Sequence, residues 1–118
     1  MDRKKELKMQ YKLMKPEMGI FIIRSKVNNK CFLKATPNLR GVINGTRVRL
    51  GSGFHPCREL QKEWDEFGPE KFSIEILERL AYDKDEAKSD YSEELEILQM
   101  LWKDKLAQEN LEFYKKRI

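Results

Sequence analysis

The sequence is poor in the residues that build disulfide frameworks and zinc sites. Its 118 residues include two cysteines, Cys31 and Cys57, and a single histidine, His55. A structural zinc site needs four ligands with paired spacings, and the chain has no CxxC pair. We therefore expect no zinc site, and we expect both thiols to be reduced.

Long hydrophobic runs are also missing. No apolar segment approaches the roughly 20 residues that a transmembrane helix needs. The opening segment, MDRKKELKMQYKLMK, lacks the apolar core of a secretory signal. Together these absences predict a cytoplasmic protein without a membrane span. The stretch Gly51-Ser52-Gly53 is not followed by Lys and Ser or Thr, so it is interpreted as a loop and not as a phosphate-binding motif.

Charge is distributed unevenly along the chain. Residues 1–62 contain 15 Lys and Arg against 4 Asp and Glu, a net charge of +11, whereas residues 63–118 contain 9 against 16, a net charge of −7. Clustered positive charge is typical of proteins with a polyanionic partner. The alternative is that the charges only keep a small domain soluble, because charges segregated in sequence need not be segregated in space.

The first half of the chain has two helical patterns. Residues 3–15 have a narrow apolar face and stop at Pro16, which cannot continue a helix. Residues 37–51 begin like a helix, but Gly41 and Gly45 each cost about 1 kcal/mol in a helix interior. This second segment is therefore predicted to be a weak or broken helix.

The second half has two stronger helical patterns. Pro56 is placed in the first turn of a helix that ends at Gly68. Residues 91–107 form the last long helix, and the tail after it is predicted to be partly helical. The expected core residues of these two helices share helical spacing and are Leu60, Trp64, Phe67, Leu95, Leu98, Trp102 and Leu106.

Three segments are predicted to be strands. Residues 19–24 and 30–35 are two apolar arms around Asn28-Asn29, a pair that suits a tight hairpin turn. Residues 71–77 alternate between apolar and polar positions, the pattern of a half-buried strand. The predicted fold is α/β of the α+β type, with a three-stranded, mainly antiparallel sheet flanked by helices. It divides into a basic helical arm (1–18), one domain (19–108) and a basic tail (109–118).

This arrangement resembles the GIY-YIG nuclease domain, from about residue 19 to residue 106. The leader that ends in Lys-Pro-Glu-Met-Gly-Ile-Phe is similar to that of a branch of small, stand-alone bacterial proteins. The stretch HPCRELQKEWDEFGPEKFSIEIL, residues 55–77, matches best. The resemblance implies this fold and, in active relatives, hydrolysis of phosphodiesters with one divalent metal ion, Mg²⁺ or Mn²⁺.

The resemblance also implies where catalytic groups would lie. In active members two tyrosines position the attacking water, an arginine stabilises charge on the phosphate, and a glutamate holds the metal. The corresponding positions here have lost that chemistry; they are Phe21 and Phe32 for the tyrosines, Val42 for the arginine, Thr46 for a frequent histidine, and Gln99 for the glutamate.

Phenylalanine has no hydroxyl group, valine has no charge, and glutamine is a weaker ligand than glutamate for a hard cation. Loss of one aimed donor costs about 10²–10³ in rate. The sequence thus predicts a catalytically degenerate domain without a metal cofactor. The alternative is an active metal-dependent endonuclease in which Glu96, one turn before Gln99, takes the place of the missing metal ligand.

The basic residues near this site favour a nucleic-acid partner, DNA or RNA, bound mainly through phosphates. The predicted binding residues are Arg24, Lys30, Lys34, Arg40, Arg47, Arg49 and Arg58. A third possibility is a protein-interaction module in which the basic surface is incidental.

Overall fold

A computed structural model of the chain describes residues 15–85 and 87–115. Its elements follow one another as β1 (Met18–Ser25), β2 (Lys30–Thr36), α2 (Leu39–Ser52), α3 (Arg58–Phe67), a short 3₁₀ turn (Pro69–Lys71), β3 (Phe72–Leu80), α4 (Ser92–Gln108) and β4 (Glu112–Phe113). The helix predicted for residues 3–15 lies outside the described residues. The three predicted strands and the last helix are confirmed.

The sheet has the strand order β3-β1-β2-β4, with β1 antiparallel to both β2 and β3. The central strand β1 is the most deeply buried, because its residues 20–23 have no exposed surface. Gly19 lies so close to β3 that a Cβ atom there would be 2.1 Å from the carbonyl oxygen of Glu78. Only glycine fits this approach of two backbones.

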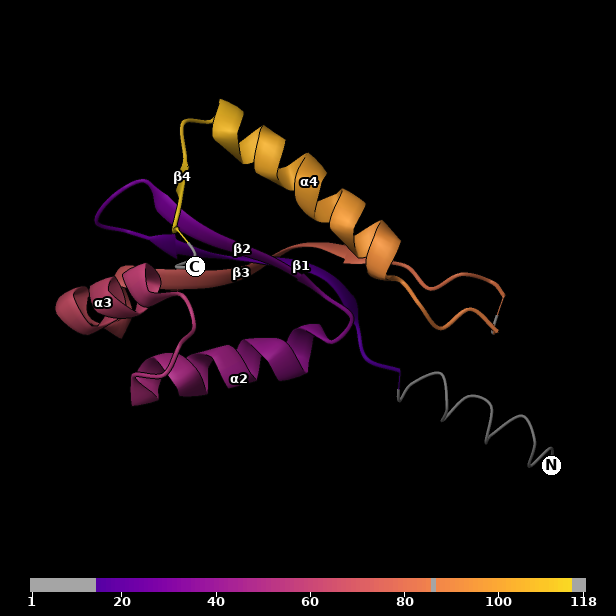
Figure 1. Cartoon of the computed structure of the whole chain (residues 1–118), viewed down its shortest axis with the longest axis horizontal. Coiled ribbons are helices and arrows are strands. Elements are labelled where there is room, and N and C mark those ends of the chain that lie inside the picture. The colour runs from indigo at the N-terminus through magenta and orange to yellow at the C-terminus, as the bar shows by residue number, and fades with distance from the viewer. Residues whose placement is uncertain (1–14, 86, 116–118) are drawn as a thin grey trace.

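Helices cover both faces of the sheet. Figure 1 shows α4 on one side and α2 with α3 on the other. Side chains alternate between the faces along each strand, so β1 supplies Phe21 and Ile23 to the core under α2 and α3, and Ile20 and Ile22 to the core under α4. On α4, Leu95, Leu98 and Leu106 are buried as predicted, whereas Trp102 is half-buried.

Helix α2 is continuous, so the prediction of a weak or broken helix is wrong. The side chain of Asn38 caps its first turn by accepting a hydrogen bond of 3.1 Å from the N–H of Gly41. The helix also contains two of the three residues predicted as a loop, and only Gly53, with φ of 81°, ends it. Cap and end groups therefore compensate for the low helix propensity of the glycines.

Helix α3 begins two residues later than predicted. Pro56 precedes Cys57, which caps the helix, so the proline lies outside its first turn. Leu60 is fully buried. Trp64 and Phe67 were also expected in the core, but they are only half-buried and pack against the apolar cluster that contains Leu60. Gly68 ends the helix as predicted, with φ of 89°.

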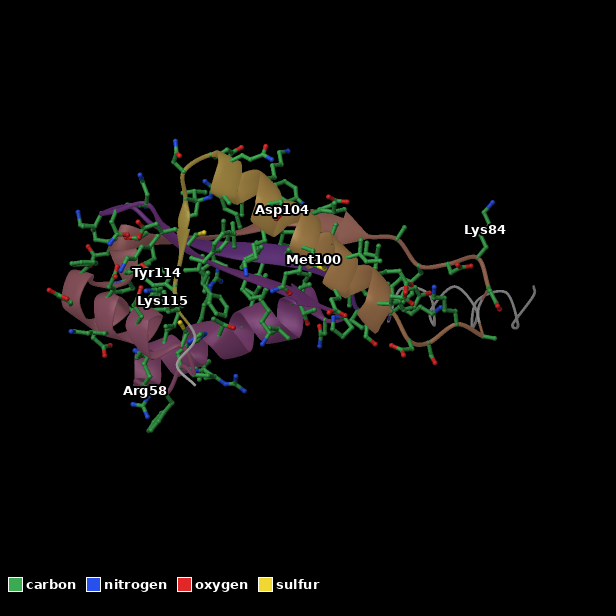
Figure 2. All side chains as sticks on the ribbon, turned by 45° about the horizontal axis from the view of Figure 1, so that its top comes forward. Arg58, Lys84, Met100, Asp104, Tyr114 and Lys115 are labelled. Atoms are coloured by element: carbon green, nitrogen blue, oxygen red, sulfur yellow. The ribbon has the colours of Figure 1, made fainter. Side chains whose placement is uncertain are left out.

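The end of the chain joins the sheet as a fourth strand, so the prediction of a partly helical tail is wrong for residues 112–113. Strand β4 runs parallel to β2, and the N–H of Glu112 donates to the carbonyl of Asn29 at 2.8 Å. Tyr114 follows with its side chain buried. Figure 2 shows Tyr114 between β4 and α3. The strand conformation of this segment results from backbone pairing with β2, which is distant in the sequence. Local periodicity does not signal such pairing.

Within the described residues, no helix is long and apolar enough to cross a bilayer.

Candidate functional site

The two hairpin aromatics share one face of the sheet. Phe21 pairs across the strands with Lys34, and Ile23 pairs with Phe32, so all four side chains lie on the face toward α2 and α3. Phe21 has no exposed surface and Phe32 is 7% exposed. Both belong to the same apolar cluster, which fills the place where the resemblance would position two hydroxyl groups.

Helix α2 presents a stripe of three residues toward this region. Val42, Thr46 and Arg49 are separated by four and three residues and therefore lie on one side of the helix. Val42 is half-buried against the apolar cluster, Thr46 is buried, and Arg49 is exposed. The guanidinium that the resemblance would place at position 42 is thus absent, but an arginine lies two turns further along the same side.

A pocket of about 210 Å³ opens between the hairpin and the loop that joins α2 to α3. Phe32 and Thr46 are among the residues that line it, and its basic side chains come from Lys34, Arg49 and His55. None of the residues that line it is Asp or Glu. The pocket is therefore cationic, and it adjoins the position of the second hairpin aromatic. We call it the basic pocket.

His55 is held firmly in this pocket. Its ring meets the ring of Phe32 edge to face, with centroids 5.2 Å apart, and its Nδ1 accepts a hydrogen bond of 3.0 Å from the N–H of Cys57. Burial lowers the pKa of His55, and the nearby charges of Lys34 and Arg49 lower it further. The lowered pKa favours the neutral imidazole, which does not add to the positive charge of the pocket.

Gln99 is on the opposite side of the sheet, on α4. Its Oε1 accepts a hydrogen bond of 3.3 Å from the backbone N–H of Ala35. Gln99 borders a pocket of about 360 Å³, and the exposed Glu96 borders it too. Across residues 15–85 and 87–115, no group of three His, Cys, Asp or Glu could hold a metal ion. At this place α4 offers a cation one neutral amide oxygen, from Gln99, and one exposed carboxylate, from Glu96.

A second pocket, of about 520 Å³, extends from Phe32 and Gln99 to the chain end and includes Lys103 and Lys115. Figure 2 shows Lys115 directly after Tyr114, beside the body of the domain. Sequence reasoning missed both lysines. They approach Phe32 only because α4 crosses the sheet and β4 pairs with β2, and no local pattern signals either event.

The predicted basic residues do not form one surface. Lys34 and Arg49 meet in the basic pocket, whereas Arg40 and Arg47 lie on the other side of α2, in a pocket that also contains Glu17 and Glu75. The remaining three are Lys30, Arg24 and Arg58.

Lys30 is engaged in ion pairs with Glu59 at 2.9 Å and Glu63 at 3.4 Å. Arg24 is half-buried, and its Nε is buried without a hydrogen-bond partner. Arg58 is exposed at the start of α3, where Figure 2 shows it at the edge of the molecule. Of the seven predicted residues, only Lys34 and Arg49 border the basic pocket.

Comparison with protein-family models and with curated protein sequences found no match. Among solved structures, the fold is similar to that of the catalytic domain of the homing endonuclease I-TevI, with a TM-score of 0.64 and 21% identity over 83% of this chain and 98% of that one. A variant of the I-TevI domain with one glutamate changed to alanine has a TM-score of 0.63 and 20% identity, over 86% of this chain and 97% of the other. I-TevI is a GIY-YIG nuclease, so the predicted fold is confirmed.

Proposed function

We propose that this chain binds DNA or RNA through the surface around the basic pocket and does not cleave it. Residues 18–58, which contain the hairpin and α2, carry eight Lys and Arg and no Asp or Glu. Clustered cations without carboxylate partners attract phosphates and bind them with strong salt dependence.

The basic pocket is the observation that carries this proposal. Lys34 and Arg49 both border it, and neither forms an ion pair with a carboxylate among the described residues. Cations without carboxylate partners remain available to a phosphate group. Lys30 is the opposite case, because Glu59 and Glu63 already neutralise it.

We expect no cleavage, because the positions that the resemblance assigns to catalysis lack the chemistry of phosphodiester hydrolysis. Phe21 and Phe32 offer no hydroxyl group to an attacking water. Val42 offers no charge to the phosphate, and the amide of Gln99 is engaged by the backbone of Ala35. With about 10²–10³ lost for each missing donor, little rate enhancement remains.

Binding is tested by fluorescence anisotropy with labelled oligonucleotides at about 50 mM and about 200 mM salt. We expect wild-type binding to weaken steeply with salt. In the Lys34→Ala/Arg49→Ala variant, the slope of log K against log salt should fall by about 2, because two phosphate contacts are removed.

The matched control is Arg40→Ala/Arg47→Ala. This variant also removes two positive charges, but from the other side of α2, where carboxylates are close. We expect a smaller change than for the pocket variant. Equal losses of affinity in the two variants would show that binding depends on the net charge of the domain and not on the basic pocket. No binding at low salt would contradict the proposal itself.

Cleavage is tested by incubating supercoiled plasmid with purified protein, with and without Mg²⁺ or Mn²⁺. We expect no nicked or linear product. Cleavage that EDTA abolishes and that Glu96→Ala removes would instead support the alternative of an active endonuclease.

A second candidate is a protein-interaction module, and the complete burial of Phe21 favours it. In that case the former catalytic face is only a folded core. A protein that binds no oligonucleotide at low salt but remains fully folded would support this candidate.

A further inference from the structure

Phe54 is the most exposed large hydrophobic side chain of the described residues, with 78% of its surface accessible. It follows Gly53, the residue that ends α2, and precedes His55, which lines the basic pocket. Within the described part of the chain, it belongs to none of the three apolar clusters and takes part in no ring contact. An aromatic ring in water gains no stability for the fold.

The backbone beneath this ring is nevertheless held rigidly. The N–H of Phe54 donates to the carbonyl of Arg49 at 2.8 Å, and the N–H of Gly53 donates to the carbonyl of Leu50 at 3.4 Å. These two bonds, with Gly53 in the left-handed conformation, form a Schellman motif at the end of α2. In that motif the residue at the position of Phe54 usually packs back on the helix.

The following residue is fixed as well. The N–H of His55 donates to Oε1 of Gln61 at 3.0 Å, and the amide of Gln61 in turn donates to the carbonyl of Leu50 at 2.9 Å. Phe54 is thus an exposed ring on a backbone that is held on both sides. When a flat partner stacks on this ring, the backbone is already ordered and only the side-chain rotamers of Phe54 lose freedom.

Two arginines lie close to Phe54 in the chain. Arg49 supplies the carbonyl that holds Phe54 and also borders the basic pocket, and Arg58 is exposed four residues after Phe54. Proteins hold a single strand with an exposed aromatic ring beside a cationic groove, the base on the ring and the backbone on the cations. Phe54 offers the ring, and the basic pocket, which includes the next residue in the chain, offers the cations.

We infer that Phe54 is a stacking platform for an unpaired nucleobase, and that the basic pocket holds an adjacent phosphate of the same strand. The preferred ligand is then single-stranded DNA or RNA, or an unpaired region of a duplex. In a paired duplex both faces of each base are covered by its neighbours, so the ring would find no partner. This inference rests on the proposed function.

The test compares three labelled probes of equal length in fluorescence anisotropy at low salt. They are a thymine 12-mer, an abasic 12-mer with the same phosphates but no bases, and a 12-base-pair duplex. We expect wild-type protein to bind the thymine strand about tenfold more tightly than the abasic strand. Phe54→Ala should lose this difference while retaining its affinity for the abasic strand.

Two further variants make the test specific. Phe54→Trp should keep the preference for bases, and its added indole fluorescence should be quenched by the thymine strand and not by the abasic one. Val48→Ala removes another exposed apolar side chain, 67% accessible, from α2 and should change nothing.

The outcomes separate this inference from the proposed function. Equal binding of the thymine and abasic strands by wild-type protein would overturn the stacking role and leave the proposed function standing, whereas binding of neither strand would overturn both. Loss of affinity for the abasic strand in Phe54→Ala would assign Phe54 a purely structural role. The inference would also fail if Phe54→Ala left strand binding intact but abolished binding to phosphatidylserine vesicles or the formation of dimers in sedimentation.

Discussion

The phenol of Tyr114 donates a hydrogen bond of 2.8 Å to Oε1 of Glu63 and so joins the end of the chain to α3. The same carboxylate oxygen accepts a hydrogen bond of 2.9 Å from the side chain of Asn28 in the hairpin turn, and Lys30 lies 3.4 Å from the other oxygen. One buried carboxylate thereby connects the hairpin, α3 and the segment after β4.

Replacing Tyr114 with phenylalanine is expected to lower the free energy of unfolding by about 2 kcal/mol, because a buried charged acceptor loses one of its donors. Urea denaturation followed by circular dichroism measures the change. Tyr82→Phe is the control: its phenol donates to the carbonyl of Pro16 in an exposed setting, so the loss there should stay below about 1 kcal/mol. Equal losses of stability in the two variants would show that the buried hydrogen bond contributes no more than the exposed one.

Acid should destabilise the fold in part through Glu63. Burial alone would raise the pKa of this carboxyl, but hydrogen bonds from Asn28 and Tyr114 and the charge of Lys30 outweigh burial and lower the pKa below its ordinary value of 4.5. A lowered folded-state pKa stabilises the protein above that ordinary value, and this stabilisation is lost as the pH falls through the folded-state pKa.

We therefore expect wild-type protein to be more stable than Glu63→Gln at pH 7, and the difference to shrink as the pH falls from about 5 to 3. Urea unfolding at each pH gives the comparison. Glu70→Gln, at an exposed position, should show no such convergence. A difference in stability that stays constant with pH would contradict this account of Glu63.

The thiol of Cys31 should be unreactive in the folded protein. Its side chain has no exposed surface, and burial raises its pKa to about 11. At pH 8 only about one molecule in a thousand would carry the thiolate, even without the steric barrier. Labelling with a disulfide reagent, followed by peptide mass spectrometry, should modify Cys31 only after denaturation. Rapid modification of native protein would contradict the buried position.

Two glycines of α2 should respond differently to alanine. A Cβ atom at Gly45 meets no atom within 4 Å, so Gly45→Ala should stabilise the protein by about 1 kcal/mol through helix propensity. A Cβ atom at Gly41 would lie 2.5 Å from Nδ2 of Asn38 and displace the capping side chain. Loss of the cap, about 1 kcal/mol, should cancel the gain in propensity. Thermal or urea unfolding of the two variants measures the difference, and equal stabilisation would mean that the cap contributes nothing.

Adding a hydroxyl group to the hairpin should cost stability without producing a nuclease. In Phe21→Tyr the hydroxyl enters a fully buried apolar cluster, so we expect a loss of about 1–3 kcal/mol. Phe32→Tyr should cost less, because Phe32 borders two pockets. Urea unfolding and the plasmid assay are the measurements. Tolerance of tyrosine at position 21 without loss would contradict its placement in the core.

The hairpin, the third strand and the last helix were predictable because their signals are local. Alternation along 71–77 and helical spacing along 91–107 report directly which face of a strand or helix is buried. The start of α3 and the continuity of α2 were less predictable, because capping groups such as Asn38 decide them and propensity does not.

The sequence alone determined the chemical identity of the candidate site: phenylalanine, valine, threonine and glutamine stand where the resemblance implies groups for catalysis, and no fold can restore a missing hydroxyl group or charge. Only the tertiary structure decided which lysines and arginines lack a carboxylate partner and so remain available to a phosphate. Lys30 is neutralised by two glutamates of α3, Lys34 and Arg49 share a pocket without carboxylates, and Lys115 reaches the site through β4. Charges act through space, and the distances between them are set by pairings between segments far apart in the chain, such as that of Glu112 with Asn29.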